Sequence, residues 1–307
     1  MSSIQTVFIT GANAGLGFES ARQLAEQKGI KKIYLGCRNL AKAETAKSKL
    51  VARTGKDIFE IVIIDVSDSQ SVRNAVKNLN APIDAVILNA GGSGGKTPNS
   101  LTKDGVTTIF AANVLGHTIF VDELLKRQMI TSTVLYAGSE TARGVPKMGV
   151  AKPDLVNYSK DEFTSVANGS RFAANADLMT VYGTIKLTAT LWMSSMARQY
   201  PHIRFVTMSP GGTTGTNGAD DLPFAKKLFF KYIGGLFMPI LGMMHSVEKG
   251  AKRYVDGLFD PRFESGSFYA SRQGAPTGPV VDQVFIEPAF GDKQAQDNAR
   301  FAIEQFS

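Results

Sequence analysis

The sequence predicts an α/β fold in which a doubly wound parallel sheet lies between two layers of helices. Two observations support this. Short β-branched runs alternate with longer helical patterns over the first two thirds of the chain, the form of successive β-α-β units. Several runs, such as Ala85 to Leu88, are apolar without alternation, as expected for strands covered by helices on both faces.

About seven strands and five main helices are expected. The strands are 5–10, 32–37, 59–65, 85–89, 133–137, 203–208 and 267–270. The helices are 16–27, 40–52, 69–79, 107–127 and 176–199. Two segments, at about 143–177 and 213–246, interrupt this rhythm and are interpreted as insertions, which usually carry substrate specificity.

Length and composition predict one domain over residues 1–307, because a chain of this size can bury one large core. The net charge is +7, but the basic residues are scattered and no dense basic run appears, so nucleic acid is not expected as a partner. Cys37 is the single cysteine, and no basic segment precedes the first apolar run. We therefore expect a cytoplasmic protein.

A glycine pattern follows the first strand and opens the first helix. Gly11, Gly15 and Gly17 form Gly-x-x-x-Gly-x-Gly, and Asn13 and Leu16 fall inside it. Glycines let a backbone turn tightly and approach a pyrophosphate, whose charge is met by free N–H groups at the positive end of a helix. The pattern predicts a Rossmann fold with these five residues at a dinucleotide.

The end of the second strand predicts which dinucleotide binds. A site that prefers NAD would usually place an acid there, whereas this chain has Arg38, with Lys42 one turn later. A guanidinium suits a 2′-phosphate. The alternative is an ordinary solvated arginine. We favour NADP(H) as the cofactor.

Further cofactor contacts are expected where the third and fourth strands end, since ligands bind at the carboxyl edge of open parallel sheets. These candidates are Asp65, Val66, Asn89, Ala90 and Gly91. We assign them to the adenine and the adjacent ribose. For Asp65, a helix cap or turn role is equally compatible with the sequence.

A candidate catalytic pair lies on the helix at 176–199. Tyr182 and Lys186 are four residues apart, so both face the same side. A nearby ammonium is expected to lower the pKa of a phenol, which could then exchange a proton with a carbonyl oxygen. Ser139 follows the fifth strand and could stabilise charge on that oxygen. Asn113 sits mid-helix, which indicates a kink or a bound water.

Together these motifs resemble the short-chain dehydrogenase/reductase superfamily, and most of all its light-dependent protochlorophyllide reductases and retinol-dehydrogenase-like members. The resemblance implies a catalytic set of Ser139, Tyr182 and Lys186, with Asn113 completing a proton relay. It also implies that Tyr182 and Lys186 contact the cofactor and that Pro210 and Gly211 border the nicotinamide with a following threonine. Thr213, Thr214 and Thr216 compete for that place, and Thr214 is preferred.

The expected function is NADPH-dependent transfer of hydride to a carbonyl or conjugated double bond, or the reverse alcohol oxidation. One alternative is light-dependent protochlorophyllide reduction. Another, of a different class, is a non-catalytic NADPH-binding or sensing protein. The three histidines have no metal-ligand spacing, so no metal site is expected.

An apolar segment at 228–244 bears on the substrate. It is short for a membrane span and is interrupted by glycines, a proline and a lysine. Three interpretations compete: a lid over a bulky apolar substrate, an element that touches a membrane surface, or a core-covering helix pair. We favour the lid, with Phe229 and Phe237 against the substrate. The sequence leaves the oligomeric state open.

Overall fold

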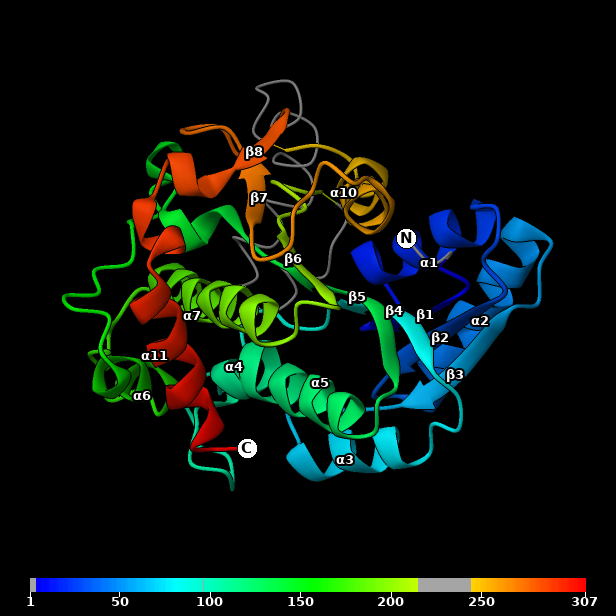
Figure 1. The fold of residues 1–307 in the computed structure, drawn as a ribbon, viewed down its shortest axis with the longest axis horizontal. Coiled ribbons are helices and arrows are strands. Elements are labelled where there is room, and N and C mark those ends of the chain that lie inside the picture. The colour runs from blue at the N-terminus through cyan, green and yellow to red at the C-terminus, as the bar shows by residue number, and fades with distance from the viewer. Residues whose placement is uncertain (1–3, 96, 215–243) are drawn as a thin grey trace.

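The computed structural model describes residues 4–95, 97–214 and 244–307. Within these ranges eight strands form one sheet in the order β3-β2-β1-β4-β5-β6-β7-β8 (Figure 1). The strands are β1 (Thr6–Thr10), β2 (Lys32–Cys37), β3 (Phe59–Ile63), β4 (Ile83–Leu88), β5 (Ile130–Ala137), β6 (Arg204–Met208), β7 (Phe268–Ser271) and β8 (Val280–Asp282). The order runs outward from β1 in one direction and from β4 in the other, which confirms the doubly wound fold.

The last strand differs from the expectation. Strands β1 to β7 pair in parallel, whereas β8 pairs antiparallel with β7 at the edge of the sheet. The sequence predicted about seven strands and missed β8. Three residues are too few to show the periodicity on which a strand prediction depends.

Helices cover both faces of the sheet (Figure 1). One face carries α1 (Gly15–Glu26), α2 (Leu40–Thr54) and α10 (Val247–Phe259), and the other carries α3 (Ser69–Lys77), α5 (Gly116–Lys126) and α7 (Leu178–Gln199). Two further helices, α6 (Lys160–Ala167) and α11 (Lys293–Glu304), pack outside α7. The three-layer arrangement expected from the sequence is therefore present.

Alternation along the strands divides the core into two halves. In β1, Val7 and Ile9 join the core under α1 and α10, while Phe8 joins the core under α3, α5 and α7. The ring of Phe8 packs 4.7 Å from that of Phe120 on α5, measured between centroids. Side chains of a strand alternate between faces, so a central strand with helices on both sides needs apolar residues throughout.

The helix expected at 107–127 is interrupted. It begins as α4 (Thr108–Phe110), passes through the π-helical turn η1 (Ala111–Leu115), and continues as α5. Asn113 lies in this turn, so the helix is irregular at the position where the sequence predicted a kink or a bound water. The stretch Thr108–Lys126 is long and apolar enough to cross a membrane, but 72% of its apolar window is buried inside the fold. It is a core helix.

The two insertions differ in how much of each is described. The first holds the short helix η3 (Pro146–Met148) and α6. In the second, Thr213 forms a parallel bridge with His245. The residues between, including Thr216, Phe229 and Phe237, lie outside the described ranges, so the lid over the substrate stays a prediction.

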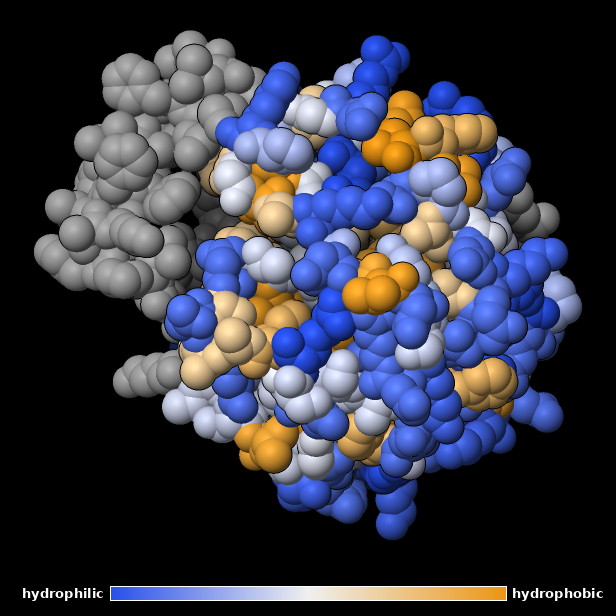
Figure 2. Space-filling view, turned by 90° about the vertical axis from the view of Figure 1, so that its left-hand side faces the viewer, coloured by the Kyte–Doolittle hydropathy of each residue, from blue (hydrophilic) through white to orange (hydrophobic). Residues whose placement is uncertain are grey.

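One outer face carries the first insertion and the C-terminal helix. Figure 2 shows that apolar side chains there form separate small patches among hydrophilic ones. The most exposed large apolar residues of the described chain are Phe285 and Val156. Scattered apolar residues of this kind are ordinary on a protein surface.

Candidate active site

The glycine turn, defined here as Gly11 to Gly17, joins β1 to α1. Gly11 has a φ of 68°, and a Cβ on Gly17 would lie 2.4 Å from the carbonyl oxygen of Gly11. Ala14 at the N-cap of α1 provides no side-chain hydrogen bond to the helix. The turn therefore presents N–H groups at a helix N-terminus that no side chain caps, beside glycines that allow a close approach of the backbone, which fits a pyrophosphate.

Side chains from β1 and β4 hold this turn in place. The amide nitrogen of Asn89 donates to the carbonyl oxygen of Thr10 at 2.9 Å. The hydroxyl of Thr10 accepts hydrogen bonds from the backbone N–H groups of Asn89 and Ala90, each at 2.9 Å. The side chain of Asn89 is thus used within the protein, and its contribution to a ligand site is to shape the turn.

Arg38 lies where the 2′-phosphate prediction needs it, directly after β2. It is exposed and makes no hydrogen bond or ion pair within the described part of the chain. Lys42 is also exposed, in the first turn of α2. Asn39 caps that helix by accepting from the backbone N–H of Lys42 at 2.9 Å. Two cations therefore flank a helix N-terminus, where an anion is stabilised.

The residues after β3 have mainly local contacts. Asp65 accepts from the backbone N–H of Ser67 at 2.9 Å and from its hydroxyl at 2.6 Å. The turn role considered for Asp65 is thus present, while the N-cap of α3 is Asp68. Val66 is nearly buried and its carbonyl lies against Gly116 at the start of α5. Assignment of Asp65 and Val66 to the adenine remains a prediction.

Lys186 is the most constrained member of the candidate catalytic set. Its side chain is buried, with a relative exposure of 3%. Its ammonium donates to the hydroxyl of Tyr136 at 3.0 Å and to the carbonyl oxygen of Ala137 at 2.9 Å, both at the end of β5. The same ammonium lies 5.4 Å from the centroid of the Tyr182 ring. The sequence-predicted pair is therefore brought together at the carboxyl edge of the sheet.

The electrostatics of this pair correct one prediction. Burial raises the pKa of the Tyr182 phenol, and the carboxylate of Glu140 adds to the rise. Burial also lowers the pKa of Lys186 to about 7. The lower phenol pKa expected from the neighbouring Lys186 is therefore not found, because the partial burial of Tyr182 and the charge of Glu140 raise that pKa instead. The phenol is protonated at neutral pH and is suited to donate.

Ser139 caps the short helix η2 (Glu140–Arg143) immediately after β5. Its hydroxyl oxygen accepts from the backbone N–H of Thr141 at 3.2 Å and from the Thr141 hydroxyl at 2.9 Å. Both lone pairs are thereby used, which leaves the hydroxyl hydrogen to be donated. A Cβ on Gly183 would lie 2.6 Å from the carbonyl oxygen of Thr141, so glycine at this position lets α7 approach η2 closely.

Asn113 contributes mainly backbone and positioning contacts. Its side-chain amide donates to the carbonyl oxygens of Ile109 and Gly92, each at 2.8 Å, and its side-chain oxygen accepts from the N–H of Gly92 at 3.1 Å. The backbone carbonyl oxygen of Asn113 accepts from the hydroxyl of Tyr136 at 2.9 Å. Through Gly92, Asn113 fixes the backbone that follows Asn89, Ala90 and Gly91.

The segment after β6 is fastened to the far end of the second insertion. His245 contacts the carbonyl oxygen of Pro210 at 2.6 Å through Nε2. The N–H of Thr214 donates to the carbonyl oxygen of His245 at 2.9 Å, and the Thr214 hydroxyl donates to the same oxygen at 3.3 Å. The Thr213 hydroxyl donates to the carbonyl oxygen of Gly211 at 3.0 Å. Neither described threonine is settled as the nicotinamide contact.

Sequence reasoning missed a buried ionic cluster behind Ser139. Glu140 accepts from the hydroxyls of Ser209 at 2.5 Å and Ser271 at 3.0 Å, and Arg253 lies 3.5 Å from it. Arg253 also donates to the carbonyl oxygen of Ser209 at 3.1 Å. The cluster joins the ends of β5, β6 and β7 to α10. No local sequence signal marks it, because its members are far apart in the chain.

Two residues near Lys186 were also undervalued. Tyr136 lies in the strand expected at 133–137, and the sequence motifs gave it no role of its own. His117 belongs to the helix near Asn113, where the sequence favours a structural or a buried and satisfied histidine, and the structure confirms the burial but not the second hydrogen bond. It is fully buried and its Nε2 lies 3.2 Å from the Thr10 hydroxyl, while Nδ1 has no hydrogen-bond partner. Burial lowers the pKa of His117 to about 3, so the ring is neutral.

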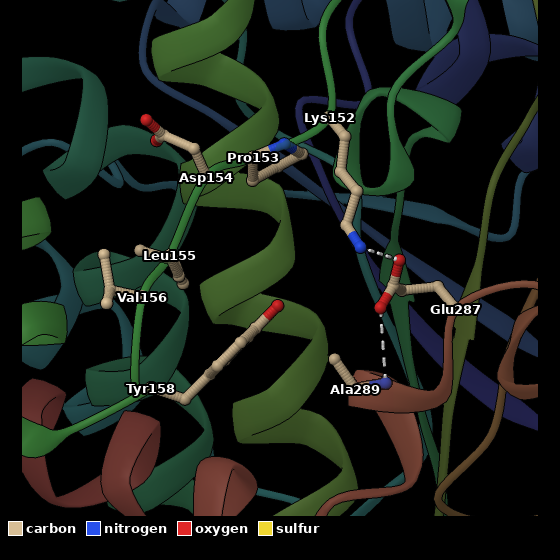
Figure 3. Close-up of a pocket in the computed structure, with 8 residues that line it drawn as sticks. All are labelled: Lys152, Pro153, Asp154, Leu155, Val156, Tyr158, Glu287 and Ala289. Atoms are coloured by element: carbon tan, nitrogen blue, oxygen red, sulfur yellow. Dashed lines mark hydrogen bonds and ion pairs between the residues drawn. The ribbon is translucent and has the colours of Figure 1, made fainter.

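A separate surface cavity of about 630 Å³ lies between the first insertion and the segment after β8 (Figure 3). The ammonium of Lys152 meets the carboxylate of Glu287 across it at 2.5 Å, and the ring of Tyr158 points into it. None of the residues that line it belongs to the glycine turn or to the set of Asn113, Ser139, Tyr182 and Lys186. We therefore do not place the reaction there.

A family model gives the first comparison with known proteins. The model described as short chain dehydrogenase matches residues 5–144, a little under half of the chain. Over these residues the chain is similar to that family. Its members are oxidoreductases that use a nicotinamide cofactor, and the Rossmann fold and the glycine turn described above agree with this similarity.

Individual relatives within the superfamily cover the chain unequally. The WW domain-containing oxidoreductase of Pongo abelii is 36% identical over 145 residues, 45% of this chain and 34% of that protein. The match thus spans about a third of that relative's length. The chloroplastic protochlorophyllide reductase B of Hordeum vulgare is 29% identical over 289 residues, 86% of this chain and 69% of that protein.

Among solved structures, that of salutaridine reductase from Papaver somniferum has a similar fold. Its TM-score is 0.61 at 18% identity, with 87% of this chain and all of that chain covered. At this identity the likeness extends to the fold alone. Asn113, Ser139, Tyr182 and Lys186, whose contacts are described above, stay the catalytic residues that the superfamily resemblance predicts.

Proposed function

We propose that this chain is an NADPH-dependent reductase that protonates the oxygen of a carbonyl, or the equivalent atom of a conjugated double bond, as that group is reduced. The observation that carries the proposal is the buried ammonium of Lys186 fixed below the ring of Tyr182, at the sheet edge where Ser139 and the glycine turn also lie. A binding protein needs no such arrangement.

Each side chain has a role that follows from its contacts. Tyr182 is protonated at neutral pH and gives its proton to the substrate oxygen. Ser139 donates its remaining hydrogen to the same oxygen, since its lone pairs are held by Thr141. Lys186 stabilises the phenolate that Tyr182 becomes. When bound, the reduced nicotinamide supplies the hydride.

Several groups of the chain fit the dinucleotide. The uncapped N-terminus of α1 and the glycine turn suit its pyrophosphate, and the exposed Arg38 and Lys42 suit a 2′-phosphate. The third N–H of Lys186, which has no acceptor among the described residues, is left for the nicotinamide ribose. Of these features, the two cations Arg38 and Lys42 support NADP(H) over NAD, because only NADP(H) carries the 2′-phosphate.

The test combines binding with turnover. Calorimetry is expected to detect NADPH binding with a clear preference over NADH, and a panel of carbonyl compounds is expected to include some that oxidise NADPH. NADPH binding without turnover of any compound would favour the non-catalytic sensing protein. No binding of either nucleotide would contradict the proposal as a whole.

Reduction of a pigment double bond is the second candidate. It is favoured by one observation: the match to protochlorophyllide reductase B extends over 86% of this chain, far beyond the cofactor-binding half. Protochlorophyllide and NADPH should then give product only under illumination. Equal rates in light and darkness with an aldehyde or ketone would assign the chain to ordinary carbonyl reduction.

A further inference from the structure

Tyr136 occupies an unusual place, between two members of the candidate catalytic set. Its side chain is fully buried at the end of β5. Its hydroxyl accepts from the ammonium of Lys186 at 3.0 Å and donates to the backbone carbonyl oxygen of Asn113 at 2.9 Å. The Lys186 ammonium also lies 4.6 Å from the centroid of the Tyr136 ring. One side chain therefore joins α7 to the π-helical turn η1.

The direction of both hydrogen bonds is fixed by chemistry. An ammonium has only donors, so the Tyr136 oxygen must accept from Lys186. A backbone carbonyl has only lone pairs, so the phenol hydrogen must go to Asn113. The phenol is neutral, since burial raises its pKa well above the ordinary value. The result is a one-way chain from Lys186 through Tyr136 to Asn113.

This series of hydrogen bonds from Lys186 through Tyr136 to Asn113 differs from the proton relay that the superfamily resemblance implies. A carbonyl oxygen has no proton to give, so the path from Lys186 toward Asn113 ends there within the described structure. What the phenol does supply is a polar acceptor and a ring face for a cation that is 3% exposed. A buried ammonium loses its hydration and needs such partners to remain charged.

We infer that Tyr136 is a positioning residue of this site: its hydroxyl holds the Lys186 ammonium below the Tyr182 ring and ties it to the π-helical turn at Asn113. The inference rests on the proposed reductase function. It adds a residue that belongs to none of the motifs on which that function was based. Its role is to keep Lys186 charged and in place while Tyr182 passes between phenol and phenolate.

Other groups around Lys186 must be considered in any pH experiment. Tyr182 shares its helix, and Tyr136 faces it from β5. The charge of Lys186 also acts on the neutral ring of His117 on α5, which lies edge-on to the Tyr136 ring with 6.0 Å between centroids. Glu140, next to Ser139, acts on the Tyr182 phenol. The change Tyr136→Phe leaves the ionisable groups of Tyr182, His117 and Glu140 in place, so this isosteric change isolates the proposed contact.

Tyr136→Phe is expected to lower kcat by about tenfold or more, because a hydrogen bond to a charged group is lost. The KM of the carbonyl substrate should change by less than about twofold. The alkaline limb of the rate profile should move to lower pH, since Lys186 loses a partner of its charged form. Tyr34→Phe is the matched control: Tyr34 is a buried tyrosine of β2, away from the catalytic set.

A second measurement needs no substrate. In protein labelled with carbon-13 at the lysine Cε, the Lys186 signal is identified by its absence in Lys186→Met, and it should titrate near pH 7. In Tyr136→Phe the midpoint should fall, whereas Tyr34→Phe should leave it in place. Circular dichroism verifies that each variant is folded.

Equal kcat, equal pH profile and an unchanged Lys186 midpoint in Tyr136→Phe would overturn the positioning role, even if the wild-type protein is an active reductase. If the wild-type protein neither binds nor oxidises NADPH, the proposed function fails. The lysine titration would still decide whether Tyr136 holds the ammonium in its charged form.

Discussion

The glycine turn and the catalytic set lie at the same edge of the sheet but are held in different ways. The turn is local: residues between Gly11 and Gly17 shape it, with Thr10 and Asn89 as its supports. The catalytic set is assembled from η1, α7 and the start of η2, and buried hydrogen bonds of Tyr136 connect β5 to η1 and to α7. A local sequence pattern can therefore predict the first, whereas the second depends on the completed fold.

The largest effect is expected from a change in the catalytic set that leaves the glycine turn and cofactor binding intact. Tyr182→Phe removes the proton donor, and general acid catalysis contributes on the order of a thousandfold. Turnover should fall by about that factor, while the Kd for NADPH from calorimetry changes little. Retained turnover would mean that another group protonates the substrate. A large loss of NADPH affinity would mean that Tyr182 serves mainly in binding.

The next largest effect is expected from a change in the glycine turn. A Cβ on Gly17 would meet the Gly11 carbonyl oxygen at 2.4 Å, so Gly17→Ala should destabilise the fold by about 3 kcal/mol and abolish NADPH binding. Gly55→Ala is the control: Gly55 has a φ of 67° and open space around it, so it should cost about 1 kcal/mol and leave binding intact. Urea unfolding and calorimetry measure both. Normal NADPH binding by the Gly17 variant would contradict the placement of the pyrophosphate.

A third change tests whether the positive charge at the end of β2 selects the cofactor. Arg38→Asp replaces the exposed cation at the end of β2 by an acid, and should shift the preference from NADPH toward NADH by about a hundredfold in kcat/KM. Lys31→Asp makes the same change in charge at the opposite end of β2 and should not alter the preference. If both variants changed the cofactor preference equally, the cause would be the overall charge of the protein and not a specific contact of Arg38 with the 2′-phosphate.

The smallest expected effect tests the histidine that connects the two regions. His117 has its pKa lowered to about 3 by burial, so the unfolded chain takes up a proton first as the pH falls below about 6.5. Stability should therefore fall by about 2 kcal/mol between pH 7 and pH 5, and His117→Gln should lose this dependence. His202→Gln, at an exposed site, should retain it. Urea unfolding at both pH values measures the difference.

Much of the fold followed from the sequence because its signals are periodic. The strand at 32–37 matches β2 at both ends, and the polar Asn113 within an apolar helix marks the place where the helix becomes irregular. The direction of the pKa shift at Tyr182 was not predictable, since it depends on burial by elements far along the chain. Tyr136 and Glu140 were missed for the same reason.

The backbone contacts of His245 with Gly212 and Thr214 bring the chain back to the place it left after β6. Closing a chain segment at a fixed pair of anchors depends only weakly on its length, by about 0.6 kcal/mol for each doubling. For a flexible segment, a change of length between these anchors would therefore cost little at the junction itself. The junction offers natural splice points for grafting a relative's corresponding segment onto this scaffold.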